Sequence, residues 1–248
     1  MRLVIKLGGN EINSPEFLSG VSAIIRDLLA AKHEVVIVHG AGKEISAMHE
    51  RLGVPFETVQ GRRKTSPEGM RIVEMVLRGE VNTRIVRTLV NEGVLALGLS
   101  GTDLGLIRTE IMDPQLGRVG RIVEVKFGLI EGFLMREMLP VLAAPVSLGL
   151  DGESLNVNAD EAAAAIASAL AADYLVMVSN VPGVLQDDKI VPELNTDLAQ
   201  SLIQTGVISG GMIPKVESAL SAVKHGVKRT LICDLPGLVN QSGTVVVR

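Results

Sequence analysis

Short apolar runs alternate with amphipathic segments along almost the whole chain. The apolar runs are bounded by glycine, proline or polar residues and predict strands over residues 3–7, 34–38, 95–99, 107–109, 119–126, 140–144, 174–178, 229–233 and 244–247. Between them, apolar positions recur with a helical period and predict helices over residues 15–31, 43–52, 68–92, 159–171, 194–205 and 215–225. This alternation with short connections is typical of an α/β fold with a mainly parallel central sheet and right-handed crossovers.

The composition favours a three-layer αβα sandwich. Apolar residues make up 47% of the 248 residues but aromatic residues only 2%, so Val, Leu, Ile and Ala must fill the core. These residues are the usual filling of a parallel sheet that has helices on both faces. We expect one continuous domain with two lobes that meet near residue 172, an N-terminal lobe over 1–171 and a C-terminal lobe over 172–248.

Charge and cysteine content exclude several classes of protein. A formal net charge of −4 gives no general attraction to nucleic acid or to an anionic membrane, and the scarcity of aromatic residues argues against base stacking. The single cysteine, Cys233, rules out an internal disulfide and is expected in the core at a strand end. No group of residues has metal-ligand spacing, so we expect no protein-bound metal. With no signal peptide and no apolar run of ~20 residues, we expect a cytoplasmic protein.

Two lysines set among glycines are the most informative chemical feature. Lys6 ends an apolar run and precedes Leu7-Gly8-Gly9, and Lys215 follows Gly210-Gly211 near the start of a predicted helix. Glycines let backbone N–H groups approach a phosphate, and a lysine ammonium supplies compact positive charge. With Asp160 between them in the sequence, the lysines favour phosphoryl transfer, in which catalysis is mostly positioning and charge neutralisation.

Other turns after predicted strands have a possible function but also fit an ordinary connection. His39-Gly40-Ala41-Gly42 offers backbone N–H groups at a helix start, and it fits a tight turn equally well. We interpret His39 as hydrogen-bonded to backbone rather than as a base. Asn158 is a candidate cap for the following helix, which leaves Asn156 unexplained.

A local cationic cluster over residues 61–65 stands out in this acidic chain. The guanidinium of Arg63 can bind a substrate carboxylate through two parallel hydrogen bonds. We interpret Arg62 and Lys64 as solvated loop charges.

Taken together and in this order, the motifs resemble the amino acid kinase family, and within it the branch that phosphorylates N-acetylglutamate. The resemblance covers nearly the whole chain and rests on segments 5–9, 39–42, 61–65, 73–82, 98–103, 116–120, 156–160, 181–185 and 211–216. The lysine strand and the Pro182-Gly183 turn are typical of the whole family. The segments around Arg63, Asn156 and Gly211 are narrower and indicate the branch.

The resemblance implies an enzyme of arginine biosynthesis that transfers the ATP γ-phosphoryl group to the side-chain carboxylate of N-acetyl-L-glutamate, giving an acyl phosphate. Mg²⁺ would travel with the nucleotide and bridge its β- and γ-phosphates. A carboxylate is already an anionic nucleophile, so no general base is needed. The implied partners are the small-molecule substrate and a second copy in a homodimer, with neither nucleic acid nor membrane.

The resemblance also implies three groups of site residues. The catalytic group is Lys6, Gly8, Gly9, Asp160 and Lys215. Lys6 and the glycine amides would stabilise the transferring phosphoryl group, Lys215 would stabilise the leaving ADP, and Asp160 would orient both lysines. The amino acid would be held by Gly40, Ala41, Arg63 and Asn156. The nucleotide would be lined by Asn180, Val181, Pro182, Gly183, Val184, Leu185, Val207, Ile208 and Ser209.

Three positions depart from the family pattern. Asn180 stands where an Asp is usual, and Lys64 replaces a usual apolar residue beside Arg63. Ala41 replaces the commoner glycine, which is tolerable only if this residue avoids positive φ.

Two alternatives stay open at this point. One is a kinase for glutamate or aminoadipate attached to an acidic carrier protein in lysine biosynthesis, with which Asn180 and Lys64 are compatible. The other is a catalytically idle sensor of an amino acid or nucleotide, against which the retention of both lysines argues. Arginine-inhibited family members carry an additional helix before the first strand, whereas here only Met1-Arg2 precede the first predicted strand. The resemblance therefore implies a homodimer that is insensitive to arginine.

Overall fold

The computed structural model describes residues 1–8, 12–59 and 62–248. Its strands are β1 (Arg2–Leu7), β2 (Glu34–His39), β3 (Glu57–Val59), β4 (Arg62–Lys64), β5 (Ala96–Gly101), β6 (Ile107–Ile111), β7 (Gly120–Val125), β8 (Leu139–Gly149), β9 (Ser154–Asn156), β10 (Tyr174–Val178), β11 (Leu185–Gln186), β12 (Lys189–Ile190), β13 (Glu193–Leu194), β14 (Arg229–Cys233) and β15 (Thr244–Val246). Its α-helices are α1 (Pro15–Ala30), α2 (Gly42–Leu52), α3 (Pro67–Glu74), α4 (Asn82–Asn91), α5 (Phe127–Leu134), α6 (Ala159–Ala169), α7 (Thr196–Gln204), α8 (Met212–Lys224) and α9 (Leu235–Asn240). A π-helix, η1 (Met75–Val81), joins α3 to α4, and short 3₁₀ turns are η2 (Asp103–Gly105) and η3 (Pro114–Leu116).

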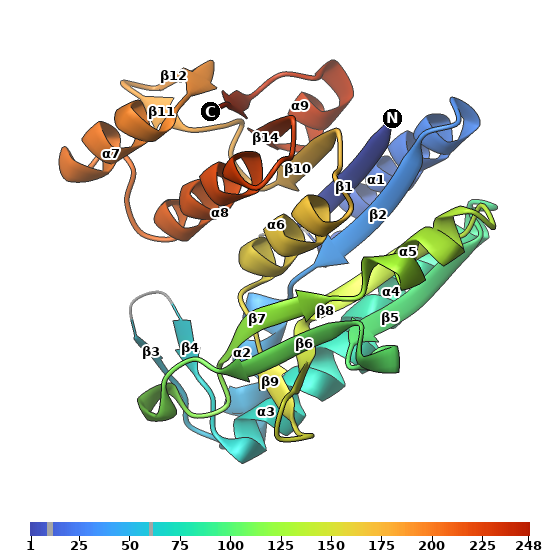
Figure 1. The fold of residues 1–248 in the computed structure, drawn as a ribbon, viewed down its shortest axis with the longest axis vertical. Coiled ribbons are helices and arrows are strands. Elements are labelled where there is room, and N and C mark those ends of the chain that lie inside the picture. The colour runs from blue at the N-terminus through green and yellow to red at the C-terminus, as the bar shows by residue number, and fades with distance from the viewer. Residues whose placement is uncertain (9–11, 60–61) are drawn as a thin grey trace.

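A mainly parallel sheet forms the middle layer of the molecule (Figure 1). Its strand order is β13-β15-β14-β10-β1-β2-β8-β6-β7, and β5 and β9 also pair with β8. The central strand β1 is parallel to both of its neighbours, β2 and β10. Antiparallel pairs occur toward the edges, between β14 and β15, β6 and β7, and β8 and β9. The predicted α/β class with a mainly parallel sheet is therefore confirmed.

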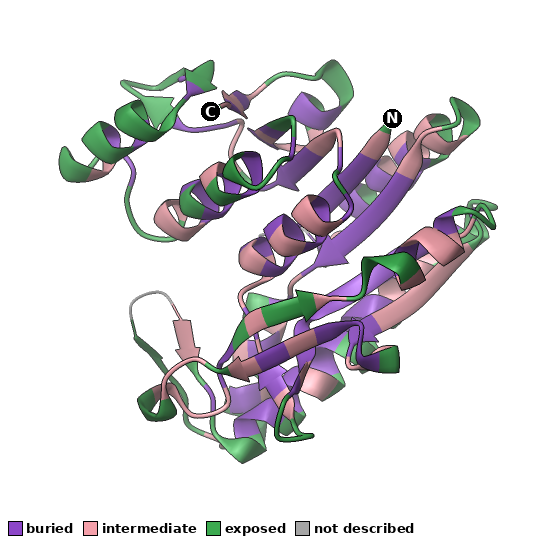
Figure 2. Ribbon diagram, viewed as in Figure 1, coloured by how far each residue is buried: buried purple, intermediate pink, exposed green. Residues whose placement is uncertain are grey.

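The two faces of the sheet have separate apolar cores. Side chains from β1, β2 and β8 alternate between the faces, as a strand period of two requires. Val4 belongs to the core that includes α6 and α8, whereas Leu3 and Ile5 belong to the core that includes α1 and α4. Lys6 has the same parity as Val4 and so faces α6 and α8. Figure 2 shows the resulting buried layer, in purple, along β1, β2 and β10.

Several elements differ from the sequence prediction. The strand predicted over 140–144 is longer and spans Leu139–Gly149, and the helix predicted over 68–92 is divided by the π-helix. The helices α5 and α9 and the short strands β3, β4, β9, β11, β12 and β13 were not predicted. Strands of two or three residues are too short to show a period, and α5 and α9 are short helices that contain glycine.

The sheet continues past residue 172, because β10 after that point pairs with β1 before it. Cys233 is buried at the end of β14, and burial followed by the nearby charge of Asp234 raises its thiol pKa to about 12. In the described part of the chain, no helix is long and apolar enough to cross a membrane.

Candidate active site

Lys6 is carried to the carboxyl end of the sheet by the central strand. It is the penultimate residue of β1, and only 6% of it is exposed. The following Gly8 makes room for it, because a Cβ on Gly8 would lie 2.1 Å from the Lys6 Nζ. Any larger residue at position 8 would displace the ammonium group. Gly9, the second glycine of the predicted turn, lies outside the described residues.

Asp160 is positioned by the N-terminus of α6. The Asn158 side chain caps this helix, with its Oδ1 accepting hydrogen bonds from the N–H groups of Asp160 at 2.8 Å and Glu161 at 3.3 Å. The predicted cap is therefore confirmed. It fixes Asp160 in the first turn, where the helix dipole favours a negative charge.

The two lysines meet at the Asp160 carboxylate. Lys6 Nζ lies 2.9 Å from Asp160 Oδ1. Lys215, which α8 brings from the other side, places its Nζ 3.3 Å from Oδ1 and 3.4 Å from Oδ2. The structure thus brings together three side chains that lie far apart in the sequence. Their catalytic roles stay predictions.

Burial and the charges within this cluster shift the pKa values of Asp160 and Lys215. Burial disfavours the Asp160 carboxylate, but the charges of Lys6 and Lys215 outweigh it and lower the pKa of Asp160. Burial and the neighbouring charge of Lys6 lower the pKa of Lys215 to about 8, although Asp160 opposes this shift. The cluster thus pairs two lysines with a single carboxylate. This excess of positive charge suits the binding of phosphate groups.

A cavity of about 310 Å³ opens beside this cluster. Its lining comes from β1, the start of α2, the β4 strand, β9 and the start of α6, and includes Lys6, Gly8, Gly40, Ala41, Gly42, Arg62, Arg63, Asn156, Asn158 and Asp160. All four residues expected to hold an amino acid lie in this lining. A small acid could thus contact them and Lys6 together.

Arg63 lines the cavity and has one buried donor without a partner. Its Nη2 donates to the backbone oxygen of Gly42 at 3.2 Å and to Ser46 Oγ at 2.7 Å, and its guanidinium lies 4.0 Å from the centre of the Phe56 ring. Its Nη1 is buried and has no hydrogen-bond partner among the described residues. A buried donor without a partner is costly, so a ligand carboxylate at Nη1 would stabilise the site.

The interpretation of Arg62 as a solvated loop charge was wrong. Arg62 lies in β4, lines the cavity, and places its Nη2 2.5 Å from Glu161 Oε1 on α6. This ion pair ties the β3–β4 hairpin to the helix that carries Asp160. The sequence signal was a second acid directly after Asp160, but its arginine partner is 99 positions away. Lys64 is exposed and pairs with Glu57 in the same hairpin.

Ala41 and Asn156 complete the amino-acid end of the cavity. Ala41 has φ −162°, an extended conformation that any residue adopts, so the methyl group in place of glycine causes no strain. Ala41 directly precedes α2 and its side chain cannot cap the helix. The first backbone N–H groups of α2 therefore stay available at the cavity, which Ala41 and Gly42 line. Asn156, unexplained by the sequence alone, lies in β9 and donates from Nδ2 to Thr65 Oγ1 at 3.2 Å.

The expected nucleotide residues lie apart from this cavity, in the C-terminal part of the chain. Residues 180–185 follow β10, and residues 207–209 precede α8, which carries Lys215. Asn180, Val207 and Ser209 are exposed, whereas Val184 and Ile208 are in the core and so contribute no side chain to a ligand surface. The N–H of Val184 donates to Thr244 Oγ1 at 2.8 Å. None of these residues lines the described cavity.

Comparison with known proteins places this geometry in a family. The model of the amino acid kinase family matches residues 1–234. The chain belongs to this family.

Two relatives and one solved structure illustrate the similarity. The chain is 49% identical to an acetylglutamate kinase of Chloroflexus aggregans over 95% of this chain and 92% of the relative. It is 44% identical to an acetylglutamate kinase of Roseiflexus castenholzii over 99% and 93% of the two chains. The crystal structure of smu.665 from Streptococcus mutans UA159 matches 99% of this chain and 98% of that one, at 33% identity and a TM-score of 0.89. The expected resemblance to the N-acetylglutamate branch is confirmed.

Proposed function

We propose that this amino acid kinase phosphorylates the side-chain carboxylate of N-acetyl-L-glutamate with ATP, as the names of its relatives indicate. The observation that supports this best is the position of Asp160 between two buried lysines at the wall of a cavity that also holds Arg63. A site with this excess of positive charge suits two anions that must react with each other. The relatives do not favour the carrier-linked kinase or the idle sensor.

In the proposed reaction a substrate carboxylate oxygen attacks the γ-phosphorus. A new C–O–P linkage forms while the bond from the γ-phosphorus to the β–γ bridging oxygen breaks, and ADP leaves. Lys6, on the cavity side, stabilises the oxygens of the phosphoryl group during transfer, and Lys215 stabilises the ADP oxygens. Asp160 keeps both ammonium groups aimed at this path. No proton has to be removed from the nucleophile.

Arg63 and Asn156 hold the other end of the amino acid. Arg63 Nη1 binds the α-carboxylate, which fixes the distance from that group to the reacting carboxylate. The uncapped N-terminus of α2 at Ala41 and Gly42 offers N–H donors beside it. This arrangement selects a short dicarboxylate rather than a monocarboxylate.

Mg²⁺ is proposed to enter with the nucleotide. Among the described residues no three or more His, Cys, Asp or Glu side chains lie close enough together to hold a metal ion. Asp160 is engaged with the two lysines through its oxygens. The phosphates themselves are suitable ligands for Mg²⁺, which would neutralise part of their charge.

The remaining assignments rest on the resemblance. ATP is proposed to lie along residues 180–185 and 207–209, so that residues 172–248 form the nucleotide lobe and residues 1–171 the amino-acid lobe. A homodimer joined through the N-terminal lobe, working in the cytoplasm, completes the proposal. Light scattering of the purified protein measures the assembly directly.

The function is tested by measuring ADP release from Mg-ATP with N-acetyl-L-glutamate, and in parallel with glutamate and N-acetylaminoadipate. Hydroxylamine is added to trap an acyl phosphate as the hydroxamate. We expect turnover and hydroxamate with N-acetyl-L-glutamate above both other acids. If all three acids are inactive while ATP binds, the proposal fails in favour of a carrier-linked substrate or a sensor.

A further inference from the structure

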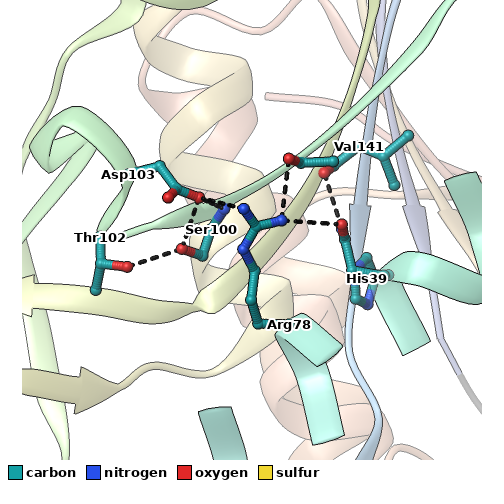
Figure 3. A network of polar contacts seen from close by, with 8 residues as sticks. His39, Arg78, Ser100, Thr102, Asp103 and Val141 are labelled. Carbon is teal, nitrogen blue, oxygen red and sulfur yellow. Dashed lines mark hydrogen bonds and ion pairs between the residues drawn. The ribbon is translucent and has the colours of Figure 1, made fainter. Parts of the chain in front are cut away.

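A polar network runs from the exposed Arg78 to His39, whose neighbour Gly40 lines the cavity (Figure 3). His39 is fully buried at the end of β2, directly before Gly40. Its Nε2 accepts a hydrogen bond from Asn82 Nδ2 at 3.0 Å, and Asn82 Nδ2 also donates to the backbone oxygen of Val141 at 2.9 Å. Asn82 therefore joins the last residue of β2 to Val141 near the start of β8, the neighbouring strand.

The hydrogen bond from Asn82 sets the tautomer of His39. Because Nε2 accepts, the single hydrogen of the neutral ring lies on Nδ1. Nδ1 is 3.4 Å from the backbone oxygen of Gly40, which can accept that hydrogen. Burial, together with the positive charges of Arg84 and Lys6, lowers the pKa of His39 to about 4, so the ring is neutral at physiological pH. The ring thus donates to the Gly40 oxygen.

The far side of the network fixes Asn82 itself. Arg78 donates from Nη1 to the backbone oxygen of Gly98 at 3.0 Å and to Asn82 Oδ1 at 3.5 Å. Its Nη2 lies 3.3 Å from Asp103 Oδ2. Gly98 leaves the space that Asn82 needs, because a Cβ there would lie 2.2 Å from Asn82 Oδ1. Figure 3 shows Arg78 between Asp103 on one side and His39 with Val141 on the other.

The backbone of the chain places Asn82 by an unusual local structure. It is the first residue of α4, directly after the π-helix over Met75–Val81. A π-helix rotates the following residues relative to a continuous α-helix, and such insertions occur frequently at functional sites. The motif around Asn82 and the motif around Gly98 are thereby explained by one contact, although neither residue touches the cavity.

The Gly40–Ala41 peptide is the point at which this network reaches the substrate. In a trans peptide the C=O of one residue and the N–H of the next point in opposite directions, and no cis peptide occurs among the described residues. When His39 holds the Gly40 oxygen on the side of α4, the Ala41 N–H points away from α4. Gly40 and Ala41 both line the cavity. We propose that Asn82 is a positioning residue that, through His39, fixes this peptide and aims the Ala41 N–H at the amino-acid substrate.

The test is the Asn82→Ala variant. Its KM measurements rest on the proposed function, whereas its hydrogen-exchange measurement does not. We expect KM for N-acetyl-L-glutamate to rise about tenfold, the factor for one lost buried hydrogen bond. KM for ATP should change by less than about twofold, because the proposed nucleotide segments do not line the cavity. Hydrogen exchange at the Gly40 N–H, which donates to the Leu7 oxygen at 3.3 Å, should become about tenfold faster.

Two further variants separate positioning from general stability. Gly98→Ala removes no polar group but displaces the Asn82 amide, so it should give the same selective rise in KM, and it serves if Asn82→Ala does not fold. Ser22→Ala removes a buried hydroxyl that donates to the Leu18 oxygen at 2.8 Å in α1, and it should lower stability without changing either KM.

Either of two results overturns the proposal: unchanged exchange at Gly40 in the Asn82 variant, or equal changes in KM for both substrates. If the wild-type enzyme does not use N-acetyl-L-glutamate, the proposed function fails. The exchange measurement at the Gly40 N–H, in the peptide directly before Gly40–Ala41, then still decides whether Asn82 holds this segment in place.

Discussion

Asp160 in α6 contacts Lys215 in α8, with the Lys215 Nζ 3.3 and 3.4 Å from the two carboxylate oxygens. The pair is buried and joins the two proposed lobes beside the cavity. Since Asp160 also contacts Lys6 at 2.9 Å, one carboxylate holds two ammonium groups that would otherwise repel each other. This arrangement involves only the protein's own side chains, so the proposed phosphate-binding charge is in place before substrate arrives.

Replacing this carboxylate should damage catalysis more than binding. In Asp160→Asn the two lysines lose their shared counter-charge and separate, so we expect kcat to fall at least about 100-fold. Steady-state ADP release measures this effect. Asp173→Asn is the control. Asp173 directly precedes β10, at the end of that strand away from the carboxyl end of the sheet, and pairs with Lys228, so this variant should leave kcat unchanged. A kcat within about threefold of wild type in Asp160→Asn would show that the lysines need no common partner.

Removing either lysine should lower turnover far more than ATP affinity. In Lys6→Ala and Lys215→Ala we expect kcat to fall about 1,000-fold, because in the proposed reaction each lysine stabilises charge that develops during transfer. The Kd for ATP, measured by calorimetry, should rise less than about tenfold. Lys64→Ala removes an exposed lysine of the β3–β4 hairpin and should leave kcat unchanged. Near-normal turnover by the Lys6 variant would exclude it from the reaction.

The reaction rate should fall on the alkaline side because of Lys215. Burial and the charge of Lys6 lower the pKa of Lys215 to about 8 in the free enzyme. Lys215 loses its proton as pH rises through that value, so kcat/KM should decline between about pH 7 and 9. The decline in kcat should occur at higher pH, since bound phosphates favour the charged ammonium. Lys215→Arg, which stays protonated, should abolish the decline; the same decline in that variant would assign it to another group.

Arg63 should control affinity for the amino acid and little else. Lysine cannot reproduce the guanidinium that contacts Ser46, Gly42 and the Phe56 ring while offering Nη1 to a carboxylate. In Arg63→Lys we expect KM for N-acetyl-L-glutamate to rise about 30-fold and KM for ATP to stay within about twofold. Kinetics with each substrate varied in turn measure this split. Equal rises in both values would place the defect in the fold rather than in substrate binding.

Gly117 should be needed for the stability of the turn that packs against Thr65. It has φ +70°, and a Cβ there would lie 2.4 Å from the backbone oxygen of Thr65. Gly117→Ala should therefore lower the free energy of unfolding by about 2 kcal/mol or more, measured by urea denaturation. Gly79→Ala is the control, because a Cβ at Gly79 meets nothing within 4 Å. A Gly117 variant as stable as that control would contradict the crowding around Thr65.

The sequence predicted the parallel sheet because its strands are buried on both faces and carry continuous apolar runs. It also singled out Lys6 and Lys215, which stand out as charges among glycines and apolar residues. The resemblance supplied the role of Asp160, since its place in a first helical turn has an ordinary electrostatic explanation. Contact between the three side chains became visible only in the fold.

Other parts of the site could not be predicted, because their signals are distributed over distant segments. The sequence predicted that Arg62 is a solvated loop charge, because strands of three residues give no pattern. In the structure the β3–β4 hairpin places Arg62 against Glu161. No role for Asn82 could be predicted from the sequence, because the π-helix and α4 are needed to bring it to His39 in β2. In both cases the informative quantity is a contact across many residues, which local pattern does not contain.

In the proposed reaction a carboxylate of the substrate attacks the γ-phosphorus. Isotope transfer tests this step, with N-acetyl-L-glutamate carrying ¹⁸O in its side-chain carboxylate incubated with the enzyme, Mg-ATP and hydroxylamine. Hydroxylamine attacks the acyl carbon, so the phosphate that leaves keeps one oxygen from the carboxylate. We predict inorganic phosphate containing one ¹⁸O, detected by its ³¹P NMR shift, in amounts equal to ADP. ADP accompanied only by unlabelled phosphate would mean that water, not the amino acid, accepts the phosphoryl group.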